Sequence, residues 1–204
     1  MGFLFLPLQA PTPQWHTFQY SKTPPNSVSF SKGGLSIVVN KSASPLFFDL
    51  EKKRAVQGVQ VRGFLSGLPK QAISTSVKEQ KDDLPFRLGF IEPSEDSPSW
   101  FQKLFLPEWL KKILEFFPNQ GVKKVHFLTL SPTQPVGTVR LHPKSHLIEE
   151  KVVLRQETAG HFEFKHRFLP AISASAIWIQ ADGDDTQSQY TLTLTEIAIE
   201  TDSK

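Results

Sequence analysis

The chain has 204 residues, a formal net charge of +3 and no cysteine. The absence of cysteine excludes disulfides, thiolate zinc sites and a cysteine nucleophile. The small, dispersed charge argues against nucleic acid as a partner. No apolar run approaches the roughly 18 residues that a membrane-spanning helix needs, so we expect no transmembrane span. Nothing in the sequence indicates the oligomeric state.

The first 14 residues carry a short apolar run that ends in the small residue Ala10. Such a run is typical of the end of a signal peptide, although the basic region that should precede it is missing. The alternative is an ordinary first strand that packs into the domain. We therefore divide the chain into an N-terminal segment, 1–14, and a single β-sandwich domain, 15–204.

Between residues 15 and 91, alternating apolar and polar segments are separated by Pro, Gly, Asn and Ser, which is typical of β-structure. The clearest signal is a tight hairpin, in which Gly33 and Gly34 lie between two such segments. The expected strands in this part cover 15–20, 28–30, 35–39, 46–50, 56–65 and 86–91.

One segment, at about 98–117, has a helical pattern instead. Ser97 can cap its start, Pro98 suits the first turn, and Pro107 should break it into two pieces. In the second piece, apolar side chains recur every three or four residues, opposite a charged face. An amphipathic helix of this kind either docks on a sheet or contacts a membrane or a partner protein.

After the helix, further strands are expected at 122–130, 139–141, 148–156 and 161–168. The last part of the chain, 171–200, has two strand-like runs around a turn rich in Asp and Gly. This pattern predicts a long hairpin that closes the domain. The elements together predict an all-β fold, a two-sheet sandwich of the jelly-roll type with one inserted amphipathic helical segment at about 98–117.

The second run of the predicted hairpin changes its phase. Its apolar positions are even up to Leu194 and odd from Ile197 onward. One strand can bury both sets on the same side only if an extra residue is inserted. We therefore predict a β-bulge near Thr195 and Glu196, or a strand that is covered on both faces there.

Arg62, Arg87 and Trp178 each stand within a predicted strand, on the parity opposite the core residues. If these strands share a sheet, one face presents two guanidinium groups and an indole ring. A carbohydrate-binding groove needs such groups, because a flat apolar ring stacks on a sugar and a guanidinium donates paired hydrogen bonds. We therefore predict that these three residues bind a ligand. The alternative is that both arginines pair with carboxylates and the indole lies under a loop or the helix.

Asp182, Asp184 and Asp185 bring hard oxygen ligands, which Ca²⁺ prefers, into one turn. Their spacing does not match an EF-hand, and Asp and Gly are also the usual residues of a turn. We expect no cofactor and keep Ca²⁺ bound by these three aspartates as the alternative.

No catalytic residue is predicted, because the sequence lacks the nucleophile, phosphate-binding and zinc motifs of common enzymes. The enzyme alternative is a glycoside hydrolase that uses a pair of carboxylates. The candidates for such a pair are Glu149, Glu150 and Glu163.

Three stretches, within 34–44, at 87–91 (RLGFI) and at 177–187 (IWIQADGDDTQ), resemble a bacterial family of unknown function whose members are mostly exported. That family is similar to the galactose-binding-type jelly rolls of many carbohydrate-binding modules. The resemblance implies a non-catalytic binding protein of the bacterial envelope, periplasmic or secreted. Its ligand would be a carbohydrate or another polar small molecule. The alternative function is a protein- or membrane-interaction module that uses the aromatic helix.

Overall fold

The computed structural model describes residues 2–70, 83–96, 110–111, 114, 121–142 and 145–202. Within these residues the fold is all-β, as predicted from the sequence. The strands are β1 (Gly2–Phe5), β2 (Trp15–Thr17), β3 (Ser27–Ser31), β4 (Gly34–Asn40), β5 (Leu46–Leu65), β6 (Phe86–Ser94), β7 (Gly121–Ser131), β8 (Val139–His142), β9 (Ser145–Arg155), β10 (Gly160–Gln180) and β11 (Gln189–Thr201).

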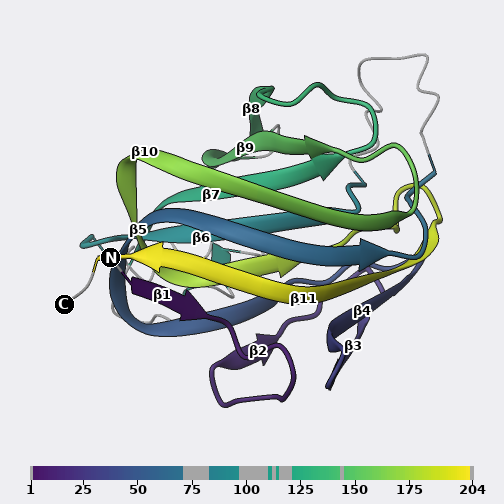
Figure 1. The fold of residues 1–204 in the computed structure, drawn as a ribbon, viewed down its shortest axis with the longest axis horizontal. Helices are drawn as coiled ribbons and strands as arrows, with labels where there is room; N and C mark the ends of the chain where they lie inside the picture. The colour runs from purple at the N-terminus through teal and green to yellow at the C-terminus, as the bar shows by residue number, and fades with distance from the viewer. Residues whose placement is uncertain are drawn as a thin grey trace.

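These strands form one hydrogen-bonded sheet with the order β3-β4-β11-β5-β10-β6-β7-β9-β8, to which β1 adds at β11 and β2 at β5. Figure 1 shows that the sheet folds over itself, so that β10, β5 and β11 lie in front of β6, β7 and β9. The two sheets expected from the sequence are therefore two layers of one continuous sheet.

The long strands β5 and β10 belong to both layers. Their antiparallel pairing runs from Leu46 opposite Ile179 to Leu65 opposite Gly160, with register shifts between Arg167 and Ile172 and just after Ala174. Irregularities of this kind bend a strand without ending it. The sequence suggested separate short strands in both regions, because a bend and a break carry similar local signals.

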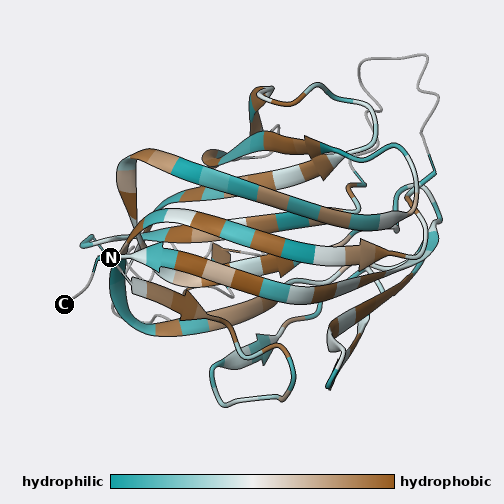
Figure 2. Ribbon diagram, viewed as in Figure 1, coloured by the Kyte–Doolittle hydropathy of each residue, from teal (hydrophilic) through white to brown (hydrophobic). Residues whose placement is uncertain are grey.

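The core lies between the two layers. Phe86 and Phe90 of β6 are fully buried, and their rings contact Phe162 and Phe168 of β10 at centroid distances of 5.9 and 5.1 Å. Figure 2 shows the matching alternation of hydrophobic and hydrophilic residues along the front strands. Each front strand therefore has a buried face and an outer face.

The predicted hairpin around Gly33 and Gly34 is confirmed, since β3 and β4 pair antiparallel across it. The predicted β-bulge is confirmed as well: the β11–β5 register shifts between Leu194 and Glu196. After this shift Ile197 and Ile199 are buried together with Leu194.

The predicted hairpin between the runs at 171–180 and 190–199 is wrong. The strands β10 and β11 follow each other in the chain, but β5 lies between them in the sheet and pairs with both. The Asp-rich turn is present at 184–187. It connects two strands that are second neighbours, because the long β5 ladder fills the place between them.

The N-terminal residues pack against the rest of the fold. Gly2 to Phe5 pair with β11, and Leu6 and Leu8 are buried in the core.

Most of the predicted helix at about 98–117 lies outside the described residues. Leu110, Lys111 and Leu114 are helical, and the two leucines are buried while the lysine is exposed. The inserted helix as a whole stays a prediction. Within the described ranges, no helix has the length and apolar character to cross a membrane.

A substitution at Gly34 tests the hairpin between β3 and β4. Its φ is +115°, and an added Cβ would clash with the Leu194 carbonyl oxygen on β11. We expect Gly34→Ala to lower the free energy of unfolding by about 1–3 kcal/mol, measured by urea denaturation. The neighbouring Gly33→Ala is the control, because a Cβ there meets its nearest atom, Ser31 Oγ, at 3.5 Å. Equal effects of both changes would contradict this account.

Candidate functional site

The three residues predicted to share a ligand groove do not share one. Arg62 of β5 lies opposite Glu163 of β10 and Glu196 of β11, on the outer face of the front layer. Arg87 of β6 and Trp178 of β10 belong to the back layer. The prediction of a common groove is therefore wrong. Residues at corresponding positions of two strands lie on one face only if both strands belong to the same layer, and Arg62 lies in a different layer from Arg87 and Trp178.

Arg87 is a buried structural residue. Its side chain is only 5% exposed and pairs with Glu150 of β9, at 3.2 Å, and with Asp182. Glu150 also accepts from Arg140 Nε at 2.5 Å. Two arginines and two carboxylates thus join β6, β8, β9 and the start of the Asp-rich turn.

Trp178 is also buried, with 2% of its surface exposed. Its ring contacts Phe47 at 5.1 Å and Phe127 at 5.0 Å, in a second, smaller hydrophobic cluster on the back layer. The indole therefore serves packing and is not accessible to a sugar.

Two of the three aspartates of the turn have separate partners. Asp182 pairs with Arg87, whereas Asp184 accepts a hydrogen bond from Thr23 Oγ1. Burial, and then the charges of Asp185 and Asp83, raise the pKa of Asp184. In the ranges that the structure describes, no three His, Asp or Glu side chains are grouped to hold a metal ion. Calcium binding gains no support from this geometry and stays a prediction.

The carboxylates considered for a glycoside hydrolase are spread over both layers. Glu149 and Glu150 are consecutive in β9 and point to opposite faces, toward Lys124 and toward Arg87. Glu163 lies on the outer face of the front layer. These three residues therefore do not supply two carboxylates that face each other across a cleft.

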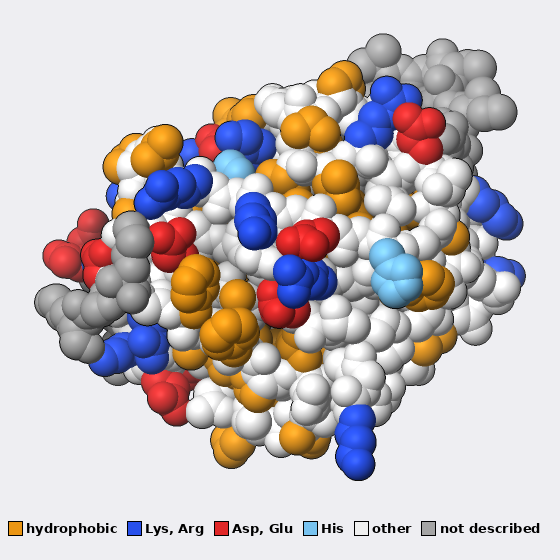
Figure 3. Space-filling view, in the orientation of Figure 1, with side chains coloured by type: hydrophobic (Ala, Val, Ile, Leu, Met, Phe, Trp, Pro, Cys, Tyr) orange, Lys and Arg blue, Asp and Glu red, His pale blue; other side chains and the backbone are white. Residues whose placement is uncertain are grey.

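The outer face of the front layer carries an ion-pair network around Arg62. Its guanidinium contacts Glu163 at 3.2 Å and Glu196 at 3.4 Å, and Glu163 also accepts from Gln60 Nε2 at 3.1 Å. The hydrogen bond to Glu163, and then the charges of Glu163 and Glu196, raise the pKa of Arg62. Figure 3 shows basic and acidic side chains next to one another across the middle of this face.

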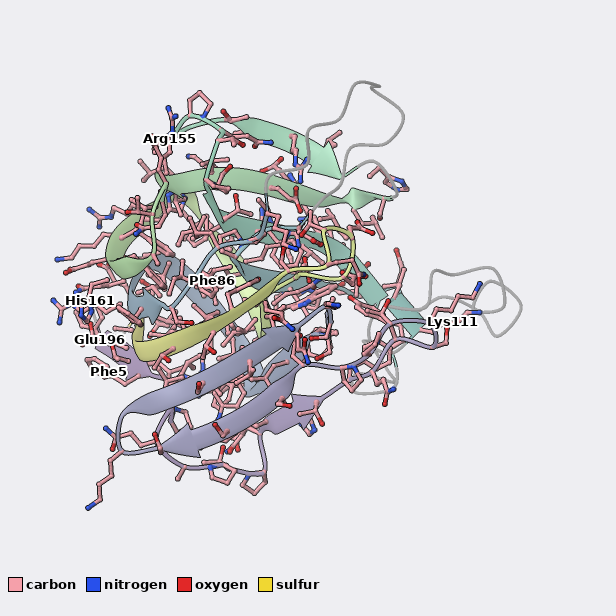
Figure 4. All side chains as sticks on the ribbon, turned by 90° about the vertical axis from the view of Figure 1, so that its right-hand side faces the viewer. Phe5, Phe86, Lys111, Arg155, His161 and Glu196 are labelled. Carbon is pink, nitrogen blue, oxygen red and sulfur yellow. The ribbon has the colours of Figure 1, made fainter. Side chains whose placement is uncertain are left out.

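Exposed aromatic rings lie at both ends of this network. At one end Phe64, 36% exposed, packs edge-on against His161 with a centroid distance of 5.0 Å. At the other end Phe3 and Phe5 of β1 are 61% and 62% exposed, and their ring centroids are 6.2 Å apart. In Figure 4, His161, Glu196 and Phe5 lie along the same flank of the molecule, and Phe86 lies inside.

The strand register gives the length of this surface. Phe64 lies opposite Thr193, and Phe3 lies opposite Glu200 on the same strand. At about 3.3 Å per strand residue, the two aromatic ends are roughly 20 Å apart. Two shallow hollows of about 400 and 350 Å³ lie between them, one beside Arg62 and the other between Phe3 and Lys165. We call this surface, formed by the outward residues of β10, β5, β11 and β1, the outer platform.

Of the predicted ligand residues, only Arg62 belongs to the outer platform. The alternation of Gln60, Arg62 and Phe64 marks them as one side of a strand, so the sequence held part of the signal. The contribution of Phe3 and Phe5 was missed, because nothing local to residues 1–14 indicates that they pair with the last strand of the chain.

No family model and no curated protein matches this chain. Among solved structures, it is similar to the xylan-binding module CBM15, with a TM-score of 0.41 and 10% identity over 100% of this chain and 97% of that one. It is also similar to the metal-free carbohydrate recognition domain of Emp46p, with a TM-score of 0.39 and 8% identity over 96% and 94% of the two chains. Both TM-scores lie below 0.5, so the functional proposal rests on this chain's own geometry.

The two arginines allow a matched test of their roles. Arg87→Met removes the positive charge that pairs with the buried carboxylates of Glu150 and Asp182. We therefore expect the free energy of unfolding to fall by about 3–5 kcal/mol. Arg62→Met, on the exposed platform, is expected to leave stability nearly unchanged. Urea denaturation of both variants measures the difference. If Arg87→Met is as stable as Arg62→Met, the structural role of Arg87 is refuted.

Proposed function

We propose that this chain is a non-catalytic binding domain whose ligand, an extended carbohydrate, lies along the outer platform. The observation that supports it is the arrangement of polar groups around Arg62 between two exposed aromatic ends. Rings offer flat apolar surface to a sugar face, and the guanidinium, amide and carboxylate groups between them match its hydroxyls. A separation of roughly 20 Å between the ends favours an oligomer over a single sugar.

The charge of the platform favours a neutral ligand. Its cations and carboxylates are equal in number and alternate across the strands, so neither sign dominates. The cations are Arg62, Lys165 and Arg167, and the carboxylates are Glu163, Glu196 and Glu200.

The proposal is for binding without catalysis, because both carboxylates nearest to Arg62 are engaged with it. Glu163 and Glu196 hold one guanidinium between them. A glycoside hydrolase instead needs two carboxyl groups on either side of an open space that holds the glycosidic bond.

Two further parts of the proposal come from the sequence. We assign the folded-over sheet to the jelly-roll type of sandwich, in which antiparallel strands cross between layers. We also place the protein in the periplasm or outside a bacterial cell.

Titration calorimetry with hexasaccharides of β-1,4-linked glucose, xylose and mannose tests the platform. We expect saturable binding of at least one of them. Phe64→Ala and Phe3→Ala should each weaken it by about tenfold, because each removes one aromatic contact at one end of the surface.

Val136→Ala is the control for these variants, since Val136 is exposed to the same degree as Phe3, at 61%, and lies outside the platform. The proposal fails if none of the three sugars binds, or if both phenylalanine variants bind as tightly as the Val136→Ala protein.

A further inference from the structure

A second, larger cleft lies on the other side of β10. It measures about 750 Å³ and opens between the bend of β10 at 166–172 and the strands β7 and β9. On β10, His166 and Phe168 alternate with Lys165 and Arg167, so the first pair faces the interior side and the second pair the outer platform. The cleft and the outer platform therefore lie on opposite sides of β10, although His166 and Arg167 border the hollows on both sides.

The floor of this cleft is charged. It carries Lys124 and His126 of β7, and Glu149 and Lys151 of β9. The register places His126 opposite Glu149 and Leu128 opposite Lys151, so these side chains form one patch of the sheet. The front layer does not cover this patch, and the charges can reach solvent through the opening.

The carboxylates of the cleft are already occupied. Glu149 binds Lys124 Nζ at 2.7 Å. Glu92 binds Lys123 Nζ at 2.7 Å and His126 Nε2 at 3.1 Å. Burial opposes the charge of Glu92, but the hydrogen bonds from Lys123 and His126 outweigh it and lower the pKa of this carboxyl.

Lys151 is a cation of the cleft that takes part in none of these ion pairs. In the part of the chain that the structure describes, it has no ion-pair partner, whereas Arg167 at the rim pairs with Glu200 of the outer platform at 3.8 Å. Burial, and then the charge of Lys151, lower the pKa of His166. The neutral imidazole can donate one hydrogen bond to a ligand beside Lys151.

We propose that this cleft is a second binding site, specific for an oxyanion group: a carboxylate, sulfate or phosphate carried by a small molecule. Lys151 supplies the charge that meets the anion, and His166 and Lys124 lie beside it in the same cleft. The exposed Leu169 and Pro170 at the rim contact the part of the ligand that carries the anionic group. The site opens on the opposite side of β10 from the carbohydrate surface, and Lys151 and Lys124 border the cleft alone.

Nuclear magnetic resonance titrations of the ¹⁵N-labelled protein test this site with three probes: sodium sulfate, sodium phosphate and sodium glucuronate. Sodium chloride keeps the ionic strength constant. We expect saturable shifts of the cleft residues for at least one probe. Preference for glucuronate identifies a sugar acid as the ligand class, and preference for sulfate or phosphate identifies an ester or free inorganic anion.

Lys151→Met should weaken this binding by about tenfold, because it removes a charged hydrogen bond. Lys32→Met is the matched control, since Lys32 is exposed in the β3–β4 turn, at the opposite end of the sheet order. Saturation with the anion should also raise the pKa of His166 in the unaltered protein, because a nearby negative charge favours the imidazolium. The imidazole resonance of His166 is identified as the one that is missing from the spectrum of the His166→Gln protein.

The proposal is overturned if no probe gives saturable shifts in the cleft, if both lysine variants lose affinity equally, or if the pKa of His166 does not rise. None of these results depends on the phenylalanine variants of the outer platform. Failure of the oxyanion site is therefore distinguishable from failure of the carbohydrate site.

Discussion

The pairing of β5 with β10 is the constraint on which the rest of the structure depends. It extends over nearly the full length of two strands of 20 and 21 residues. Because both strands bend, the same ladder supports the front layer at one end and the back layer at the other. The outer platform exists because β11 and β1 add to one edge of this ladder. The cleft lies where β10 bends, between that bend and the strands β7 and β9.

The buried ionic network fixes the other end of the molecule. Asp182, which follows β10, contacts Arg87 of β6, and its carbonyl oxygen accepts a hydrogen bond from Tyr190 of β11 at 2.9 Å. Burying these charges is costly unless every one is matched. Glu150 lies between Arg87 and Arg140, so the strands β6, β8 and β9 must hold their relative positions for the charges to match. The network therefore links the back layer to the connection between β10 and β11.

The sequence predicts what a residue does within its own strand, and fails where the neighbouring strand decides. Parity alone predicts either a bulge near Glu196 or a strand covered on both faces there, since apolar residues of both parities reach the same side only if a residue is inserted. Parity cannot tell that β5 separates β10 from β11, because pairing between distant segments leaves no local pattern. Arg62 and Arg87 illustrate the same limit. They have the same local pattern in the sequence. Arg62, however, is exposed and pairs with glutamates of β10 and β11, whereas Arg87 is buried and pairs with the buried Glu150 and Asp182.

The two proposed sites meet at β10, whose neighbouring residues face opposite sides. Coupling between them would require an element with two arrangements that both ligands bias. The register here argues against such an element: Lys165, His166 and Arg167 lie opposite Gln60, Val59 and Gly58 without interruption. A rotation that turned His166 outward would slip the register by one residue and move Phe164 and Phe168 out of the core. The loss of two buried aromatic side chains makes that change too costly, so the strand separates the two surfaces and holds each in place.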